Sequence, residues 1–184
     1  MFKKSVRCVE IEISSYCNRI CSYCPNVFID RRSSQTFIDD DVFNNILTSL
    51  ALINYSSVNR LNRYNEPLSD REYYLKRMKQ VREKLPNARF EVYSNGDYLN
   101  HDYVETLYNN GCRGMHITAH HEWKEYTQER AEKYLKNLIK KLGYEFTILN
   151  STDSITQCEV HVRSDMNFTY NILNFMADTE TGNI

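Results

Sequence analysis

Short apolar segments alternate with longer amphipathic ones along most of the chain. The apolar segments are rich in Val, Ile, Phe and Tyr and only a few residues long, which is typical of β-strands. We expect strands at Val9–Ser14, Val58–Asn62, Arg89–Ser94, Met115–Thr118, Glu145–Leu149 and Glu159–Arg163.

The longer segments repeat apolar residues at helical spacing. The clearest repeat, with Lys and Glu on its other face, is made by Ala131, Tyr134, Leu135, Leu138, Ile139 and Leu142. Such a stripe indicates core packing. Asp70 and Pro86-Asn87 are start and stop signals for one helix, and Gly111 and Gly143 stand where C-caps are expected. We expect helices at about Asp39–Ile53, Asp70–Leu85, His101–Asn110 and His121–Leu142.

Repeated strand–helix units are typical of parallel strands joined by right-handed crossovers. A closed eight-unit barrel takes about 250 residues, so the 184 residues present allow about six units. The predicted fold class is therefore α/β, a partial (β/α)6-type barrel with mainly parallel strands, or else an open α/β sheet. The connection from Leu149 to Glu159 is too short for a helical crossover, so the last two strands are either antiparallel or misplaced. No repeat or flexible linker interrupts the pattern, and we expect residues 1–184 to form one domain.

The charges of the chain nearly cancel. There are 23 basic and 24 acidic residues, which argues against a nucleic-acid partner. No apolar run reaches the roughly 18 residues of a membrane span, and no apolar signal-peptide core follows the basic N-terminal residues. We therefore expect a cytoplasmic protein that does not associate with membranes.

The placement of the cysteines adds chemical information. Three of the six cysteines lie within Cys17–Cys24, whereas Cys8, Cys112 and Cys158 are scattered singly. A secreted disulfide framework distributes its cysteines, and ligand sites cluster them. The clustered cysteines therefore predict a metal site, and the single ones predict small apolar core residues.

Cys17, Cys21 and Cys24 follow the spacing C-x3-C-x2-C. A tetrahedral zinc site normally takes a fourth Cys or His from a second pair, and ferredoxin-type clusters take four cysteines. Three thiolates leave one iron of a four-iron cluster open to bind a reactant. The motif also begins where the first predicted strand ends, at the edge where α/β folds place active sites. The spacing favours an open iron–sulfur site, with zinc and buried structural cysteines as the alternatives.

The sequence around these cysteines resembles the radical S-adenosylmethionine (SAM) superfamily. In that family an aromatic residue precedes the last cysteine and lies near the adenine, and Tyr23 has this position. The segment Tyr64–Leu68 is similar to the family's Gly-Gly-Glu motif in its Gly-Glu-Pro-Leu form, which receives the methionine amino group. The chain departs from the motif by placing Tyr64 and Asn65 where glycines are usual. The resemblance implies cofactor contacts for Tyr23, Asn65 and Glu66.

Two more segments continue the resemblance, which runs from about Val9 to His120. Tyr93-Ser94-Asn95-Gly96 is similar to the family's (Ser/Thr)-Asn-Gly motif, whose hydroxyl residue contacts the ribose or the carboxylate, and this implies a contact for Ser94. Ile117-Thr118-Ala119 stands where the family often has Ser-Leu-Asp, which adds Thr118 as a candidate. Arg163, at the end of the last predicted strand, is either a ligand of the methionine carboxylate or an exposed ion-pair partner.

The resemblance implies a [4Fe–4S] cluster held by Cys17, Cys21 and Cys24, with SAM bound at the open iron. One electron, from a reductant such as flavodoxin or ferredoxin, then cleaves SAM to a 5′-deoxyadenosyl radical that abstracts hydrogen from an unknown organic substrate. Similar members often modify peptides or oxidise sugar alcohols, so a peptide or a small molecule is the expected substrate. They also often carry further clusters in a C-terminal extension. No cysteine follows Cys158, which indicates either a minimal member or a shortened one.

Other functions remain open at this level. A non-catalytic iron–sulfur or zinc-binding scaffold would keep the three cysteines without needing Tyr23, Glu66 and Ser94 together. Without the cysteines, Glu66 would be an ordinary loop carboxylate and Ser94-Asn95-Gly96 an ordinary turn. His116 and His120, followed by His121-Glu122, lack the H-E-x-x-H spacing of a zinc helix, so a polar lining near the substrate is the favoured interpretation.

Overall fold

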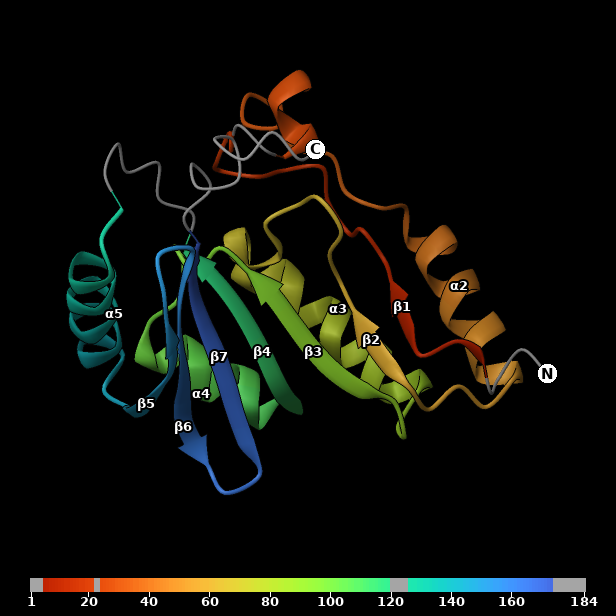
Figure 1. Cartoon of the computed structure of the whole chain (residues 1–184). Helices are drawn as coiled ribbons and strands as arrows, with labels where there is room; N and C mark the ends of the chain where they lie inside the picture. The colour runs from red at the N-terminus through yellow and green to blue at the C-terminus, as the bar shows by residue number, and fades with distance from the viewer. Residues whose placement is uncertain (1–4, 22–23, 120–125, 174–184) are drawn as a thin grey trace.

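A single mixed sheet organises the molecule (Figure 1). The computed structural model describes residues 5–21, 24–119 and 126–173. Within them the sheet has seven strands in the order β1-β2-β3-β4-β7-β6-β5. Their bounds are β1 Cys8–Glu10, β2 Val58–Arg60, β3 Arg89–Ser94, β4 Cys112–Ala119, β5 Glu145–Ser151, β6 Ile155–Arg163 and β7 Met166–Leu173. Strands β1, β2, β3, β4 and β7 run parallel, and β6 and β5 continue the sheet in antiparallel pairing.

The helices begin behind polar caps. They are α2 Asp40–Leu52, α3 Arg71–Lys84, α4 His101–Asn109 and α5 Gln128–Leu142, with short 3-10 helices η1 Pro25–Phe28 and η2 Pro67–Ser69. Asp39, Asp70, Asn100 and Thr127 each accept a hydrogen bond from a backbone N–H in the first turn of their helix. Gly143 ends α5 in the left-handed conformation. In the described part of the chain, no helix is both long and apolar enough to cross a membrane.

The predicted fold class is confirmed: the structure is α/β, with mainly parallel strands in a partial-barrel arrangement. The sequence prediction missed β7, which occupies the place beside β4. Only turns connect β5, β6 and β7, and a short turn can join only antiparallel neighbours. A signal for β7 was present, because Met166, Phe168, Tyr170 and Ile172 alternate with polar residues and are all buried.

The last helix also starts later than predicted. Thr127 has an extended backbone and caps α5, so the helix begins at Gln128 rather than at His121. Residues 120–125 of the predicted helix lie outside the described residues.

The two faces of the parallel strands differ in polarity. Side chains such as Phe90, Val92 and Ile117 are buried in the core, on the face that α3 and α4 cover (Figure 1). The alternate residues, among them Tyr93 and His116, lie on the opposite face and are only half buried. The sheet thus has an apolar face toward the helices and a polar face that is available for a site. As predicted, Cys112 and Cys158 are fully buried core residues, whereas Cys8 is only half buried.

Candidate functional site

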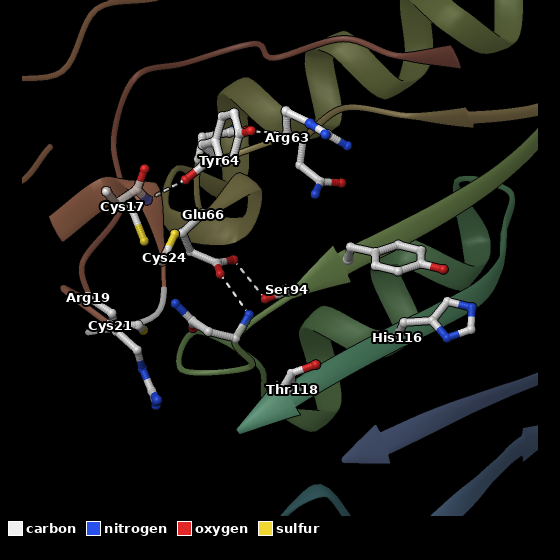
Figure 2. A pocket seen from close by; sticks show the side chains of 15 residues that line it. Cys17, Arg19, Cys21, Cys24, Arg63, Tyr64, Glu66, Ser94, His116 and Thr118 are labelled. Carbon is white, nitrogen blue, oxygen red and sulfur yellow. Dashed lines mark hydrogen bonds between the residues drawn. The ribbon is translucent and has the colours of Figure 1, made fainter. Parts of the chain in front are cut away.

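A cleft of about 240 Å³ opens at the carboxyl edge of the parallel strands. Its walls are the cysteine loop after β1, the loop after β2, and the ends of β3 and β4 (Figure 2). Parallel strands bring these segments together because their carboxyl ends share one edge. The lining includes most of the residues proposed from the sequence: Cys17, Cys21, Cys24, Asn65, Glu66, Ser94 and Thr118. Tyr23 lies outside the described residues.

Backbone hydrogen bonds hold the start of the cysteine loop. The Cys17 N–H donates to the Arg31 carbonyl over 3.1 Å, which closes the loop on itself. The Glu66 N–H donates to the Tyr16 carbonyl over 2.8 Å. The cysteine loop is therefore joined directly to the segment that carries Glu66.

Asp97 fastens the middle of the cysteine loop to the turn after β3. Its carboxylate accepts hydrogen bonds from Asn18 Nδ2 over 2.7 Å and from Arg19 Nε over 2.6 Å, and Arg19 Nη2 makes a second contact with it. Asn95 Nδ2 donates to Asn18 Oδ1 over 2.8 Å. Sequence reasoning missed Asn18, Arg19 and Asp97, although they lie inside or next to the two motifs that it singled out.

Glu66 is the only carboxylate in the described lining of the cleft, and 2% of its surface is exposed. Its Oε1 accepts hydrogen bonds from Ser94 Oγ over 2.7 Å and from the Leu68 N–H over 3.1 Å. Its Oε2 accepts one from the Asn95 N–H over 2.8 Å. Among the described residues no Lys, Arg or His pairs with it, so its charge is held by neutral donors alone.

Burial raises the pKa of the Glu66 carboxyl, while the hydrogen bonds from Asn95, Ser94 and Leu68 act in the opposite direction. A buried charge is costly unless an opposite charge or several hydrogen bonds compensate for it. The three donors provide part of this compensation, and a bound cation would provide the rest.

The turn after β3 requires a glycine at position 96. The Gly96 N–H donates to Ser94 Oγ over 3.0 Å, and Gly96 has a φ of +80°. A Cβ at this position would lie 2.5 Å from the Tyr170 hydroxyl and 2.6 Å from Ile117 Cγ2, so only glycine fits. This turn directs both Ser94 Oγ and the Asn95 N–H toward Glu66 (Figure 2).

Tyr64 and Asn65 fit where the family motif has glycines. Asn54 has the only positive φ among the described non-glycine residues, so neither of these two positions needs glycine for its backbone conformation. The Asn65 side chain is buried, accepts a hydrogen bond from the Arg63 N–H over 3.2 Å and donates to Ser14 Oγ over 3.4 Å. Asn65 thus lines the cleft and uses its side chain to shape the loop.

The three clustered cysteines are free thiols, each half buried. Burial raises the pKa of the Cys17 thiol, and a hydrogen bond from the Arg19 backbone acts against that rise. Within the described residues, no group of three or more ligating side chains is already arranged to hold a metal ion. The loop therefore has to adjust to bind a metal, as ligand loops often do because binding and ordering are coupled. The donor set, three thiols without a fourth in the described lining, fits a cysteine-held cluster with an open iron.

His116 and Thr118 lie on the polar face of β4 and line the same cleft. The His116 ring contacts the Tyr93 ring, with 4.5 Å between the centroids, and its Nδ1 lies 2.9 Å from Thr169 Oγ1. Neither neighbour is a preferred zinc ligand, which agrees with a polar lining rather than a zinc site.

The structure corrects the assignment of Arg163 to the cofactor. Because β6 is antiparallel to β7, Arg163 lies beside Met166 at the opposite edge of the sheet, where β7 begins. Its side chain is half exposed and pairs with Glu105 over 2.5 Å. The ion-pair alternative is the correct one for Arg163.

The chain was then compared with known proteins. It is 30% identical over 112 residues to the S-adenosyl-L-methionine-dependent 2-deoxy-scyllo-inosamine dehydrogenase of Niallia circulans, an alignment that covers 61% of this chain and 44% of the relative. Its fold is similar to that of BtrN in an open conformation, with 26% identity and a TM-score of 0.56 over 64% of this chain and 51% of BtrN. BtrN in complex with AdoMet and 2-DOIA gives 25% identity and a TM-score of 0.57 over 73% and 54% of the two chains.

No protein-family model matches the chain. The chain spans about half the length of the relatives that it matches. In sequence and in fold it is similar to enzymes that use SAM, one of which is a dehydrogenase.

Proposed function

We propose that this chain is the SAM-binding core of a radical SAM enzyme of the dehydrogenase type. Residues 1–184 would form that core, with a [4Fe–4S] cluster held by Cys17, Cys21 and Cys24. One observation carries the proposal: Glu66, a buried carboxylate without a cationic partner among the described residues, shares a cleft with three free thiols. The similarity to SAM-dependent enzymes supports it.

Different residues of the cleft suit the [4Fe–4S] cluster and SAM. Thiolates are preferred ligands of iron–sulfur clusters, and three of them leave one iron open. When bound, the cluster supplies the electron that cleaves SAM to methionine and a 5′-deoxyadenosyl radical. Cys8, Cys112 and Cys158 lie outside the lining of the cleft, so they are not proposed as ligands.

Glu66 is proposed to bind the ammonium group of the methionine moiety. A carboxylate facing an ammonium makes a charge-assisted contact, which is stronger than a neutral hydrogen bond. Ser94 and the Asn95 N–H hold this carboxylate in one orientation before the ligand arrives. Such preorganisation reduces the ordering cost of binding. Tyr23 near the adenine, together with Asn65 and Thr118, completes the proposed SAM site.

The proposed reaction removes a hydrogen atom from a hydroxyl-bearing carbon of a small molecule. That hydrogen atom would pass to the radical that SAM supplies when it is bound, and loss of the hydroxyl proton to solvent and of one electron to an acceptor would leave a carbonyl group. A one-electron protein such as a flavodoxin or ferredoxin would supply the first electron, and a one-electron acceptor would take the last. A cytoplasmic location fits this chemistry because thiols stay reduced there. The dehydrogenase similarity favours this reaction over peptide modification.

The decisive experiment is anaerobic reconstitution of the chain with iron and sulfide, followed by SAM and dithionite. We expect a [4Fe–4S] absorption spectrum and release of 5′-deoxyadenosine and methionine in equal amounts. Slow release without substrate would support the proposal, because the radical can be quenched by solvent or protein. Uptake of zinc in place of iron, or a cluster that leaves SAM intact, would overturn the proposal in favour of a non-catalytic scaffold.

A further inference from the structure

Arg19 brings a positive charge into the cysteine loop, between the first two of the proposed cluster ligands. It stands between Cys17 and Cys21 in the sequence and lines the cleft together with them. Figure 2 shows its side chain extending from the cysteine loop on the side where Cys21 lies. A guanidinium group stays protonated in proteins, so this loop carries a permanent cation.

Both the backbone and the side chain of Arg19 face a cysteine. The Arg19 backbone N–H donates a hydrogen bond to the Cys17 thiol. The guanidinium lies close enough to Cys21 for the two side chains to interact electrostatically. Hydrogen bonds to sulfur and nearby positive charges both favour the reduced state of an iron–sulfur cluster, which is the more negative state. By itself, Arg19 would therefore raise the reduction potential of a cluster held by this loop.

Asp97 places a negative charge directly against this cation. Its Oδ2 accepts a hydrogen bond from Arg19 Nε over 2.6 Å, and its Oδ1 contacts Arg19 Nη2. The hydrogen bond with Asp97 raises the pKa of the Arg19 guanidinium, and burial acts against that rise. The side chains of Arg19 and Asp97 are 19% and 34% exposed, so water screens the pair only in part. Two opposite charges in direct contact largely cancel at a more distant site.

Arg19 is the less exposed of the two arginines in the described lining of the cleft. The other is Arg63, whose side chain is 58% exposed and pairs with Glu10 over 2.7 Å, so water screens its charge more strongly. Tyr134 of α5 lies close to both Arg19 and Asp97. Burial raises the pKa of Tyr134, so this neighbour is uncharged at pH 7. The charge balance around the Arg19 guanidinium therefore depends on Asp97.

We infer that Asp97 keeps the reduction potential of the proposed cluster low by neutralising the charge of Arg19. Asp97 acts through Arg19 and is therefore a positioning residue: it holds the guanidinium in place and cancels its electrostatic effect on the cysteine loop. A low potential is useful here because the cleavage of SAM requires a strongly reducing electron. This inference rests on the proposed function, which assigns the cluster to the cysteine loop.

The test is an anaerobic redox titration of the reconstituted chain without SAM, followed by absorption and electron paramagnetic resonance. Asp97→Asn keeps the size and a hydrogen-bond acceptor but leaves Arg19 uncompensated, so the potential should rise. Arg19→Gln keeps a donor but leaves Asp97 uncompensated, so the potential should fall. Each change should shift the ratio of reduced to oxidised cluster at a fixed ambient potential by about tenfold, which is about 59 mV for a one-electron couple.

The opposite signs separate an effect of charge from a distortion of the loop. A loosened loop would admit water, which would shift the potential in the same direction in both variants. Arg19→Lys keeps the charge, and the double variant Arg19→Gln/Asp97→Asn carries neither charge, so both should titrate close to the wild type. The matched control is Asp165→Asn, which removes the carboxylate that pairs with Arg113 over 3.1 Å at the opposite edge of the sheet. It should leave the potential unchanged.

An unchanged potential in either single variant, or a shift of both in the same direction, would overturn the inference. The potential is measured on the clusters that form, so a variant that takes up less iron still gives a result. Iron, sulfide and SAM-cleavage assays on the wild type test the proposed function separately. A wild type without a cluster would overturn the proposed function and this inference together, whereas normal SAM cleavage with unchanged potentials in the variants would overturn this inference alone.

Discussion

Ser94 donates a 2.7 Å hydrogen bond to the carboxylate of Glu66, a residue 28 positions earlier in the chain. The family resemblance assigns these two residues to different parts of SAM, yet the structure joins them. The Asn95 N–H binds the second carboxylate oxygen, so the turn after β3 orients Glu66 from both sides. A change at Ser94 should therefore act partly through Glu66.

Glu66→Gln should weaken SAM binding, because an ammonium–carboxylate contact becomes a neutral one. Hydrogen bonds to charged groups contribute about 1.5–3 kcal/mol, which corresponds to roughly 10- to 100-fold in Kd. Isothermal titration of the reconstituted protein without reductant measures this change. Two controls at the opposite edge of the sheet, Glu105→Gln and Arg163→Ala, should leave the Kd unchanged. Unchanged affinity in Glu66→Gln would remove Glu66 from the proposed SAM site.

Ser94→Ala should also weaken SAM binding, but by less than Glu66→Gln. If Ser94 acts by orienting Glu66, then the double variant should bind SAM about as weakly as Glu66→Gln alone. The same titrations, arranged as a double-mutant cycle, give the coupling energy. Additive losses would show instead that Ser94 contributes a separate contact of its own.

Asp97→Ala should loosen the cysteine loop with little effect on the whole fold. It removes the carboxylate that binds Asn18 and Arg19. Partly exposed ion pairs contribute about 0–1 kcal/mol, so the free energy of unfolding should change little. Trypsin should cut after Arg19 faster in this variant, and iron uptake should fall. The control is Asp165→Ala, which removes the ion-pair partner of Arg113 at the opposite edge of the sheet. Trypsin should cut this variant after Arg19 at the wild-type rate.

Iron content should separate the six cysteines into two groups. Ser variants of Cys17, Cys21 or Cys24 should lose most of the iron, because each leaves only two thiolates for the cluster. Ala variants of Cys8, Cys112 and Cys158 should keep it, although the last two remove a fully buried side chain and will lower the melting temperature. Iron and sulfide assays after anaerobic desalting provide the measurement. Loss of iron in a folded Cys8→Ala protein would contradict the ligand assignment.

The stability of the cluster-free chain should depend on His116 at mildly acidic pH. Burial lowers the pKa of His116 below its ordinary 6.5. Of the charged groups nearby, Glu91 opposes this shift and Arg60 adds to it, and the uncharged Tyr93 ring lies against the imidazole. The unfolded state then binds more protons than the native state in this range, so stability falls as the pH drops below about 6.5. Urea unfolding of the wild type and of His116→Phe should show a smaller fall in the variant over that range. An equal pH dependence in both proteins would contradict the lowered pKa.

Much of the local structure could be read from the sequence. The polar caps and apolar stripes predicted α2, α3 and α4 to within one or two residues, since these signals act over a single helical turn. Local spacing also singled out Cys17–Cys24, whereas the Glu66 segment and the Ser94 turn were singled out by the family resemblance. Their positions at strand ends predicted a shared edge.

Only the tertiary structure decided the features that depend on pairing between distant segments, which are the strand order and the contacts between the loops of the cleft. Two tight turns make β6 antiparallel to both β5 and β7, and this pairing puts β7 beside β4. It also puts Arg163 at the opposite edge of the sheet, which no residue near Arg163 specifies. The ion pair of Arg19 with Asp97 and the hydrogen bond of Ser94 to Glu66 join residues far apart in the chain. Such contacts depend on how the loops pack at the sheet edge. Local propensity extends over a few residues, whereas a cleft is made by segments that meet only when the sheet has formed.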